Sequence, residues 1–323
     1  MSESTPSSGE EYPGTWVEFL ERFSSEDACA LYLEKVRWPN GFACPRCGVV
    51  AEPYRSSRGR MMCRDCRTQT TVTAGTILDK TRTSLRVWLA AMWYVTNQKH
   101  GVSALGLQRV LGFGSYQTAW AILHRLRRAM VRPGRDQLHG DVEVDETHVA
   151  ITDIAKTQSG RGIQSNTLDA IVVIAIERLK TKGFGRIRLR RVLSKSSMHI
   201  LPFIREVVAP GSRVCTDGSG AYLELTADGF VHQKNVLLGS DQPAHAVLPG
   251  VHRVASLLQR WLLGTHHGAI HAGHLDSYLD EFVFRFNRRT SRSRGLLFYR
   301  LVEQAVATAP VTYEKIVKSR KSV

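Results

Sequence analysis

The stretch VEVDETHV, residues 142–149, combines the pattern of a β-strand with a cluster of acids. Its alternating valines favour a strand that buries one face, whereas Asp and Glu are depleted from strands. Three carboxylates, those of Glu143, Asp145 and Glu146, would repel one another unless something positive lay between them. Two interpretations follow: a solvated strand edge, or a site that holds a metal ion.

The composition is that of a globular protein with a basic surface. The chain has 323 residues, enough for two or three domains, and 43% of them are hydrophobic. Lys and Arg number 44 against 29 Asp and Glu, a net charge of +15. This surplus favours a polyanionic partner, most simply nucleic acid, over a merely soluble basic protein.

No apolar run reaches the ~18 residues that span a bilayer. The N-terminal residues MSESTPSSGEEYPG are polar and acidic and lack a signal-peptide pattern. We therefore expect a cytoplasmic protein with reduced thiols and no membrane partner. The six cysteines would then be metal ligands or buried single residues, and we assign Cys29 and Cys215 to the second kind.

Four cysteines have the spacing of a zinc site. CPRC supplies Cys44 and Cys47, and CRDC supplies Cys63 and Cys66. Two such pairs predict a four-thiolate zinc ribbon, because each CxxC turn points both sulfurs at one ion. Zinc would supply most of the stability of so small a unit. The arginines around it favour DNA binding over a purely structural role.

The following segment predicts helices. Leu85, Leu89 and Trp93 recur at helical spacing, a short helix is expected over 104–111, and another begins near Ser115. Helix, glycine-containing turn and helix is the outline of a DNA-binding helix-turn-helix, although a plain helical hairpin has the same pattern. The polar side of the second helix carries five residues that could face DNA: Gln117, His124, Arg125, Arg127 and Arg128.

After a break at Pro133-Gly134 the pattern changes to a mixed sheet. We expect strands at 142–149, 170–177, 185–193 and 212–218, a helix over 196–210, and a polar connection over 153–166. Asp145 lies on the first strand and Asp217 at the end of the fourth. If those strands are neighbours, both carboxylates could hold Mg²⁺ or Mn²⁺ for phosphoryl transfer.

The chain resembles the transposases of the insertion sequence 1595 family. The similar segments are RWPNGFACPRCG, CRDCRTQTTVTAGTILDKTR, SYQTAWAILHRLRRAM, VEVDET, TDGSGAY, SLLQRWLLGTHH and LDEFVFRFNRR. The resemblance implies an RNase H-like DDE transposase domain that cuts and joins DNA with two divalent metal ions. VDET places the first catalytic acid at Asp145, and TDG places the second at Asp217.

The third catalytic position departs from the family pattern. Alignment on SLLQR and GTHH puts His252 at the acid, Pro249 at the usual Asn and Gln259 at the usual Lys. Three interpretations remain: an active Asp-Asp-His enzyme, an enzyme whose third ligand is Asp280 or Glu281, and a degenerate or domesticated copy that only binds DNA. An imidazole ligand would favour Mn²⁺ over Mg²⁺.

The helix over 274–289 ends in RFNRRTSRSR, where phosphate contact is favoured over a solvated face. Together with the second helix of the pair, the catalytic domain supplies these candidate DNA-binding residues: Gln117, Arg125, Arg127, Arg128, Gln259, Arg260, Arg288 and Arg289.

We therefore expect an α+β multidomain protein. Its predicted parts are a helical lead-in (1–30), a zinc ribbon (31–72), a helix-turn-helix region (73–135), an RNase H-like mixed-sheet catalytic domain (138–305) and a basic tail (306–323). The family implies a homo-oligomer acting on double-stranded DNA, at element terminal repeats and target sites, in the nucleoid of the bacterial cytoplasm. A zinc-ribbon partner of the transcription machinery is disfavoured by the acid pair.

Overall fold

The computed structural model describes residues 6–56, 59–132, 134–156, 163–181, 183–235, 247–268 and 270–318, without the side chains of 153–156 and 163–167. The chain divides into two compact units. The first comprises Met1–Arg132 and Ser291–Ile316, and the second comprises Pro133–Thr290 and Val317–Val323. No described helix is long and apolar enough to cross a membrane.

The first unit contains helices and a small ribbon sheet. Its elements, in chain order, are α1 (Trp16–Arg22), α2 (Glu26–Arg37), β1 (Tyr54–Arg55), β2 (Met61–Met62), β3 (Gln69–Thr70), α3 (Leu85–Asn97), α4 (Ala104–Leu111), α5 (Tyr116–Ala129), α10 (Arg294–Ala307) and α11 (Tyr313–Lys318). The ribbon strands pair antiparallel in the order β1-β2-β3.

An aromatic cluster ties α10 to the N-terminal helices. The Phe298 ring lies 5.8 Å from that of Phe19 and 5.5 Å from that of Trp93, and Phe298 is fully buried. Residues 294–305 fall within the bounds predicted for the catalytic domain (138–305). Packing instead assigns them to the first unit, because the amphipathic pattern of a helix does not reveal which core it will join.

The helix pair α4 and α5 has the predicted bounds. Gly112 ends α4 in the left-handed conformation (φ 68°), and the Ser115 hydroxyl accepts from the Thr118 N–H to cap α5. Serine caps a helix start and glycine a helix end because each satisfies backbone groups that the helix leaves unpaired. The two expected helices, one over 104–111 and one that begins near Ser115, are confirmed.

The second unit is built on a five-stranded mixed sheet. Its elements are β4 (Asp141–Lys156), β5 (Ile163–Arg178), β6 (Phe184–Val192), α6 (Ser197–Val207), β7 (Arg213–Thr216), η1 (Gly220–Leu225), β8 (Val231–Lys234), α8 (Pro249–His266), η2 (Ala272–His274) and α9 (Leu275–Asn287). The strand order is β6-β5-β4-β7-β8. β4, β5 and β6 pair antiparallel, whereas β7 runs parallel to β4 and to β8. The expected β-β-β-α-β order is confirmed.

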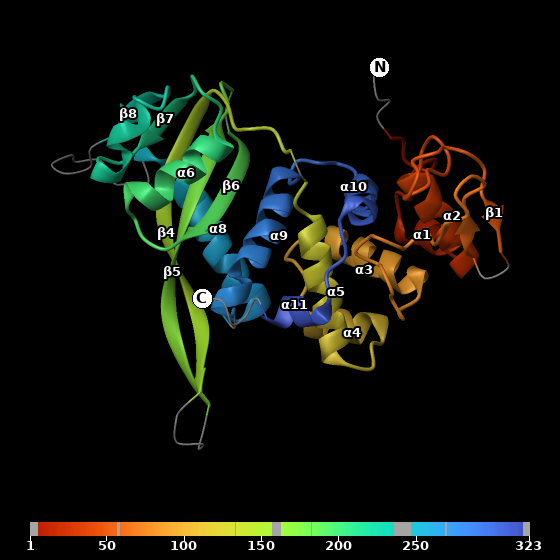
Figure 1. Ribbon diagram of the computed structural model, residues 1–323. Coiled ribbons are helices and arrows are strands. Elements are labelled where there is room, and N and C mark those ends of the chain that lie inside the picture. Colours follow the sequence, from red (N-terminus) through yellow and green to blue (C-terminus); the bar gives the residue numbers. More distant parts are fainter. Residues whose placement is uncertain are drawn as a thin grey trace. The chain divides into compact units, whose positions relative to one another are not determined.

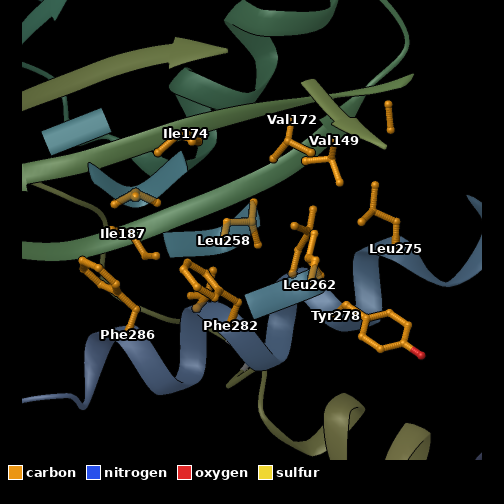
Figure 2. Packing of buried hydrophobic residues seen from close by; sticks show 14 of the residues in the cluster. Val149, Val172, Ile174, Ile187, Leu258, Leu262, Leu275, Tyr278, Phe282 and Phe286 are labelled. Carbon is orange, nitrogen blue, oxygen red and sulfur yellow. The ribbon is translucent and has the colours of Figure 1, made fainter. Parts of the chain in front are cut away.

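Helices cover both faces of this sheet (Figure 1). α6 packs on the face that carries Val142 and Val144. On the other face, α8 and α9 pack over β4, β5 and β6, where Leu258 and Phe282 meet Val172, Ile174 and their neighbours (Figure 2). Burial of this kind contributes about 1.5–3 kcal/mol for each large side chain. The sheet centre is therefore a rigid support for side chains at the strand ends.

β4 and β5 are longer than expected. Their backbones stay paired as far as Lys156 and Ile163, through parts of a segment that the sequence analysis assigned to a polar connection; residues 157–162 lie outside the described residues. Thr152 anchors this extension, since its N–H donates to Ile270 O at 2.8 Å. Backbone hydrogen bonds between strands do not require an apolar face. The alternation of hydrophobic residues therefore could not predict where β4 and β5 end.

Asn287 closes the edge of the sheet. Its Oδ1 accepts from the Ile187 N–H at 2.7 Å, and its Nδ2 donates to Ile187 O at 3.1 Å. Ile187 lies on the edge strand β6 and is fully buried. We expect Asn287→Ala to lower the free energy of unfolding by about 2–4 kcal/mol, because it leaves a buried donor and a buried acceptor unpaired.

Chemical denaturation measures this loss. Gln137→Ala is the matched control, because its amide also donates to a backbone carbonyl, Glu206 O at 3.1 Å, but at an exposed position. We expect the control to cost less than about 1 kcal/mol. Equal losses in the two variants would contradict the role given to Asn287.

Candidate functional site

The four cysteines of the ribbon converge on one point. Their sulfurs all lie within 4.8 Å of one another, with Cys44 Sγ 3.5 Å from Cys66 Sγ and Cys47 Sγ 3.6 Å from Cys63 Sγ. Tetrahedral zinc with Zn–S bonds of about 2.3 Å separates its sulfurs by about 3.8 Å. The donor set and its spacing therefore fit a structural zinc ion.

The two CxxC turns have matching backbones. The Gly48 N–H donates to Cys44 O at 2.9 Å, and Gly48 is left-handed with φ 73°. Arg67 occupies the equivalent place after the second pair with φ 58°. Hydrogen bonds between Cys66 and Thr68, first through the Thr68 side chain and then through its backbone, lower the pKa of Cys66 to about 6, which favours the thiolate that binds metal.

A second group of side chains gathers where β7 ends beside β4. The parallel register pairs Glu143 with Cys215, so the same register carried two residues further aligns Asp145 with Asp217. Neighbouring strands lie about 4.8 Å apart. The Asp217 carboxylate accepts from the Ser219 N–H at 3.0 Å, which fixes it in a turn just beyond β7. The condition that the two strands be neighbours is met.

The adjacent Glu146 points to the α6 side of the sheet. Its carboxylate accepts a hydrogen bond from the Tyr222 hydroxyl, and Lys195 Nζ lies 4.0 Å from its Oε2. Tyr222 is fully buried and Glu146 nearly so. Glu146 is thus a buried side chain with hydrogen-bond and charge partners, so it does not belong to a solvated strand edge.

Negative charge is in excess at this place. Burial and the nearby Asp217 raise the pKa of Asp145 to about 6. Burial also raises the pKa of Glu146, and the charge of Asp145 adds to that effect. Lys195 is the cation that acts on both acids. Two aligned carboxylates that repel each other in a half-buried site fit a divalent cation with oxygen ligands.

Glu143 joins the acidic strand to α8. Its side chain is fully buried, and its Oε2 accepts from the Gly250 N–H at 2.7 Å and the Val251 N–H at 3.1 Å. These belong to the first turn of α8, which has no side-chain cap of its own. A Cβ at Gly250 would lie 2.8 Å from the same oxygen, so glycine is required for this approach. A carboxylate there is also stabilised by the helix dipole.

We expect Glu143→Ala to lower the free energy of unfolding of this unit by about 2–4 kcal/mol, because it leaves two buried N–H groups without a hydrogen-bond acceptor. Glu143→Gln keeps one acceptor and should lose about half as much. Denaturant titration measures both, with the exposed Glu224→Ala as control, which should lie within about 1 kcal/mol of wild type. A loss no larger than the control's would refute the capping role.

His252 lies one residue beyond this cap, in the first turn of α8, and interacts electrostatically with Glu143. Among the described residues, the ribbon cysteines form the one group of three or more Cys, His, Asp or Glu whose ligand atoms all lie within 4.8 Å. Asp145, Asp217 and His252 do not form such a group.

The alternative third ligands lie on α9, which packs over β6 at the far edge of the sheet from β7. Glu281 is 1% exposed and accepts from Arg285 Nε at 2.8 Å. Burial raises the pKa of Asp280 to about 7, and the charges that act on it are those of Arg135 and Asp276. The structure does not bring either residue to Asp145 and Asp217.

The candidate DNA-facing side chains of α5 differ in exposure. Gln117 and Arg128 are exposed and Arg125 is partly buried. His124 and Arg127, expected on the polar side, are instead 3% and 2% exposed, with Arg127 NH1 3.3 Å from His124 Nε2. Their side chains are therefore not exposed in this structure.

The candidates of the second unit are also unequal. Gln259 and Arg260 are exposed on α8, and Gln259 Nε2 donates to His148 O at 3.2 Å. Arg288 stacks on Phe284 with its Cζ 4.0 Å from the ring centroid. Arg289 donates to Phe184 O and to Gly185 O, so its guanidinium holds α9 to the start of β6.

Sequence reasoning missed two residues that contact the acidic site, Lys195 and Tyr222. It also missed that Glu143 caps α8. Tyr222 lies in the segment TDGSGAY, five residues beyond Asp217, and Lys195 lies three residues after the end of β6. No spacing rule connects them to β4, since only the fold brings α6, η1 and β4 together.

Two protein-family models match this chain. The ISXO2-like transposase domain matches residues 137–287, which contain the mixed sheet and its acidic site. The transposase zinc-ribbon domain matches residues 24–69, which contain α2 and the four cysteines. A comparison with curated proteins found no match.

Proposed function

Since the chain belongs to the insertion sequence 1595 family of transposases, we propose that it binds the ends of a DNA element and catalyses their cleavage and joining to target DNA. The observation that carries the proposal is the parallel pairing of β4 with β7, which runs as far as Glu143 and Cys215 and leads into Asp145 and Asp217, whose charge raises the pKa of Asp145. The strand order β6-β5-β4-β7-β8, with three antiparallel strands followed by two parallel ones, supports an RNase H-like fold for this unit.

In this proposal Asp145 and Asp217 hold divalent metal ions, and His252 completes the site from the first turn of α8. Bound Mg²⁺ or Mn²⁺ supplies activation of the attacking oxygen and stabilisation of the leaving oxygen. The chain's own residues position these groups: Glu143 fixes α8 against β4, while Tyr222 and Lys195 hold Glu146 beside Asp145.

We assign DNA binding to the first unit and to the basic surfaces of the second. The exposed first turn of α5, which carries Gln117, would read base edges in the manner of a recognition helix. Arg128, Arg260 and Arg288 would contact phosphates, which gives affinity that falls with salt. A homo-oligomer on paired DNA ends, in the nucleoid, is the expected working form.

A second candidate is a DNA-binding protein without catalysis, favoured by His252 standing where the family has an acid. Incubation of wild type and Asp217→Asn with a duplex that carries an element end distinguishes the two. Metal-dependent nicking by wild type alone supports the enzyme. Salt-sensitive binding without nicking, in Mg²⁺ and in Mn²⁺, supports the binding protein.

A further inference from the structure

An open cavity of about 300 Å³ lies beside α5 in the first unit. One wall is the segment before α3, with Lys80, Thr81, Arg82 and Thr83, and the other is α5, with Gln117 and Arg125. We call it the α5 groove. None of its lining residues belongs to the acidic site or to the zinc site.

The charge of the α5 groove is uncompensated. Three of its lining residues are cations and none is an acid. Arg125 is the most revealing of the three, because burial lowers the pKa of its guanidinium and no carboxylate offsets that effect. Within the described part of the chain, Arg125 makes a single hydrogen bond, from Nε to Val311 O at 3.3 Å. A partly buried cation of this kind calls for an anion.

The wall opposite α5 is held in a defined shape. The Trp88 indole N–H donates to Thr81 Oγ1 at 2.8 Å, and the Thr83 N–H donates to the same oxygen at 3.1 Å. Trp88 is fully buried, so this wall is anchored to the core. Lys80 adopts a left-handed conformation (φ 51°) just before it. The cations at Lys80 and Arg82 are therefore carried by a preorganised turn, which lowers the entropy cost of binding.

We propose that the α5 groove binds a backbone phosphate of the DNA strand that α5 reads, through Lys80, Arg82 and Arg125. The inference rests on the proposed DNA-binding function and adds a phosphate subsite to it. Gln117 lines the same groove two helical turns before Arg125, so a phosphate held here would fix the register of the α5 N-terminus against the base edges.

The first test is the salt dependence of binding to a mixed-sequence duplex of about 25 base pairs. Each phosphate contact contributes about 0.9 to the slope of log affinity against log salt concentration. We expect Lys80→Ala and Arg82→Ala each to reduce the slope by about that amount, whatever the DNA sequence. Lys35→Ala, an exposed lysine on α2 outside the groove, is the control and should keep the wild-type slope.

Arg125→Met separates binding from folding. If Arg125 binds a DNA phosphate, the Arg125→Met variant should bind DNA more weakly than wild type. Its melting temperature should equal or exceed that of wild type, because the substitution removes a partly buried charge that lacks a counter-ion. If Arg125 is structural, the melting temperature falls. Competition with inorganic phosphate tells a general anion pocket from one that needs the polymer: displacement of DNA at millimolar phosphate would contradict the DNA assignment.

Wild-type slopes in all three groove variants, beside normal wild-type binding, would overturn this inference and leave the proposed function standing. Failure of the wild type to bind either the mixed duplex or an element end would overturn the proposed function, and this inference with it.

Discussion

Asp145→Asn is expected to reduce strand cleavage by on the order of 10³-fold or more, since it removes a carboxylate from the centre of the proposed metal site. DNA binding should persist, because the candidate DNA contacts lie elsewhere on the chain. Cleavage of a labelled element end at saturating protein measures the rate, and a mobility shift measures the affinity. Cleavage within about tenfold of wild type would remove Asp145 from the chemistry.

The same variant should stabilise the metal-free protein. Burial and Asp217 raise the pKa of Asp145 from 3.8 to about 6, so the folded state binds this proton more tightly than the unfolded chain does. Stability linked to this group is present below about pH 4 and is lost as the pH rises through about 6. At pH 7 the deficit is roughly 1–3 kcal/mol.

Thermal melts across this pH range test the sign. In buffer without added Mg²⁺ or Mn²⁺, wild type should lose melting temperature between about pH 4 and 6 relative to Asp145→Asn. Addition of Mn²⁺ should raise the wild-type melting temperature and leave the variant's nearly unchanged. A wild type that matches the variant at every pH and in both metal conditions would contradict the proposed carboxylate pair.

Zinc removal is the second large effect. The ribbon strands β1, β2 and β3 have two residues each, so hydrogen bonding and burial contribute little to this part of the chain. Zinc bound by four thiolates contributes on the order of 10 kcal/mol. We therefore expect chelation, or Cys44→Ser, to unfold residues 43–70 while the mixed sheet stays folded.

Zinc content by metal analysis and hydrogen exchange of the ribbon amides measure this effect together. Cys29→Ser is the matched control, since Cys29 is buried on α2 outside the cluster and should leave the zinc content at one ion per chain. Ribbon amides that remain protected after complete zinc loss would show that the metal does not hold this fold.

The sequence predicted those parts of the fold whose causes are local. Ser115 and Gly112 mark the ends of two helices because capping depends on a few neighbouring residues. The CxxC spacing is likewise a local property, and the four cysteines that it selected do form one cluster. The order of strands and helix in the second unit followed from alternating patterns over short stretches.

Features that depend on tertiary packing could not be predicted. Nothing local to Phe298 says that its helix joins the aromatic cluster of Phe19 and Trp93. Arg127 lies at a position that the sequence pattern assigns to the polar side of its helix, yet its side chain is buried. Glu143 stands out in the sequence only as one of three acids on a strand, and its role as the cap of α8 depends on a contact across more than a hundred residues of sequence.

The acidic site lies between these cases. Asp145 and Asp217 could be selected from the sequence, but their alignment depends on β7 pairing with β4 in one register. His252 was placed by family resemblance, and the structure puts it in the first turn of α8, beside the Glu143 cap. Its role as a ligand stays a prediction.

Joining of a pre-cut end is the sharpest test of whether the Asp145–Asp217 site joins DNA ends. A duplex that carries an element end with a free 3′-hydroxyl is incubated with wild-type protein, a supercoiled target plasmid and either Mg²⁺ or Mn²⁺. We predict joined product with a preference for Mn²⁺, because a histidine ligand suits that ion better. Protein that binds the end tightly but yields no joined product in either metal would show that this site does not join DNA ends.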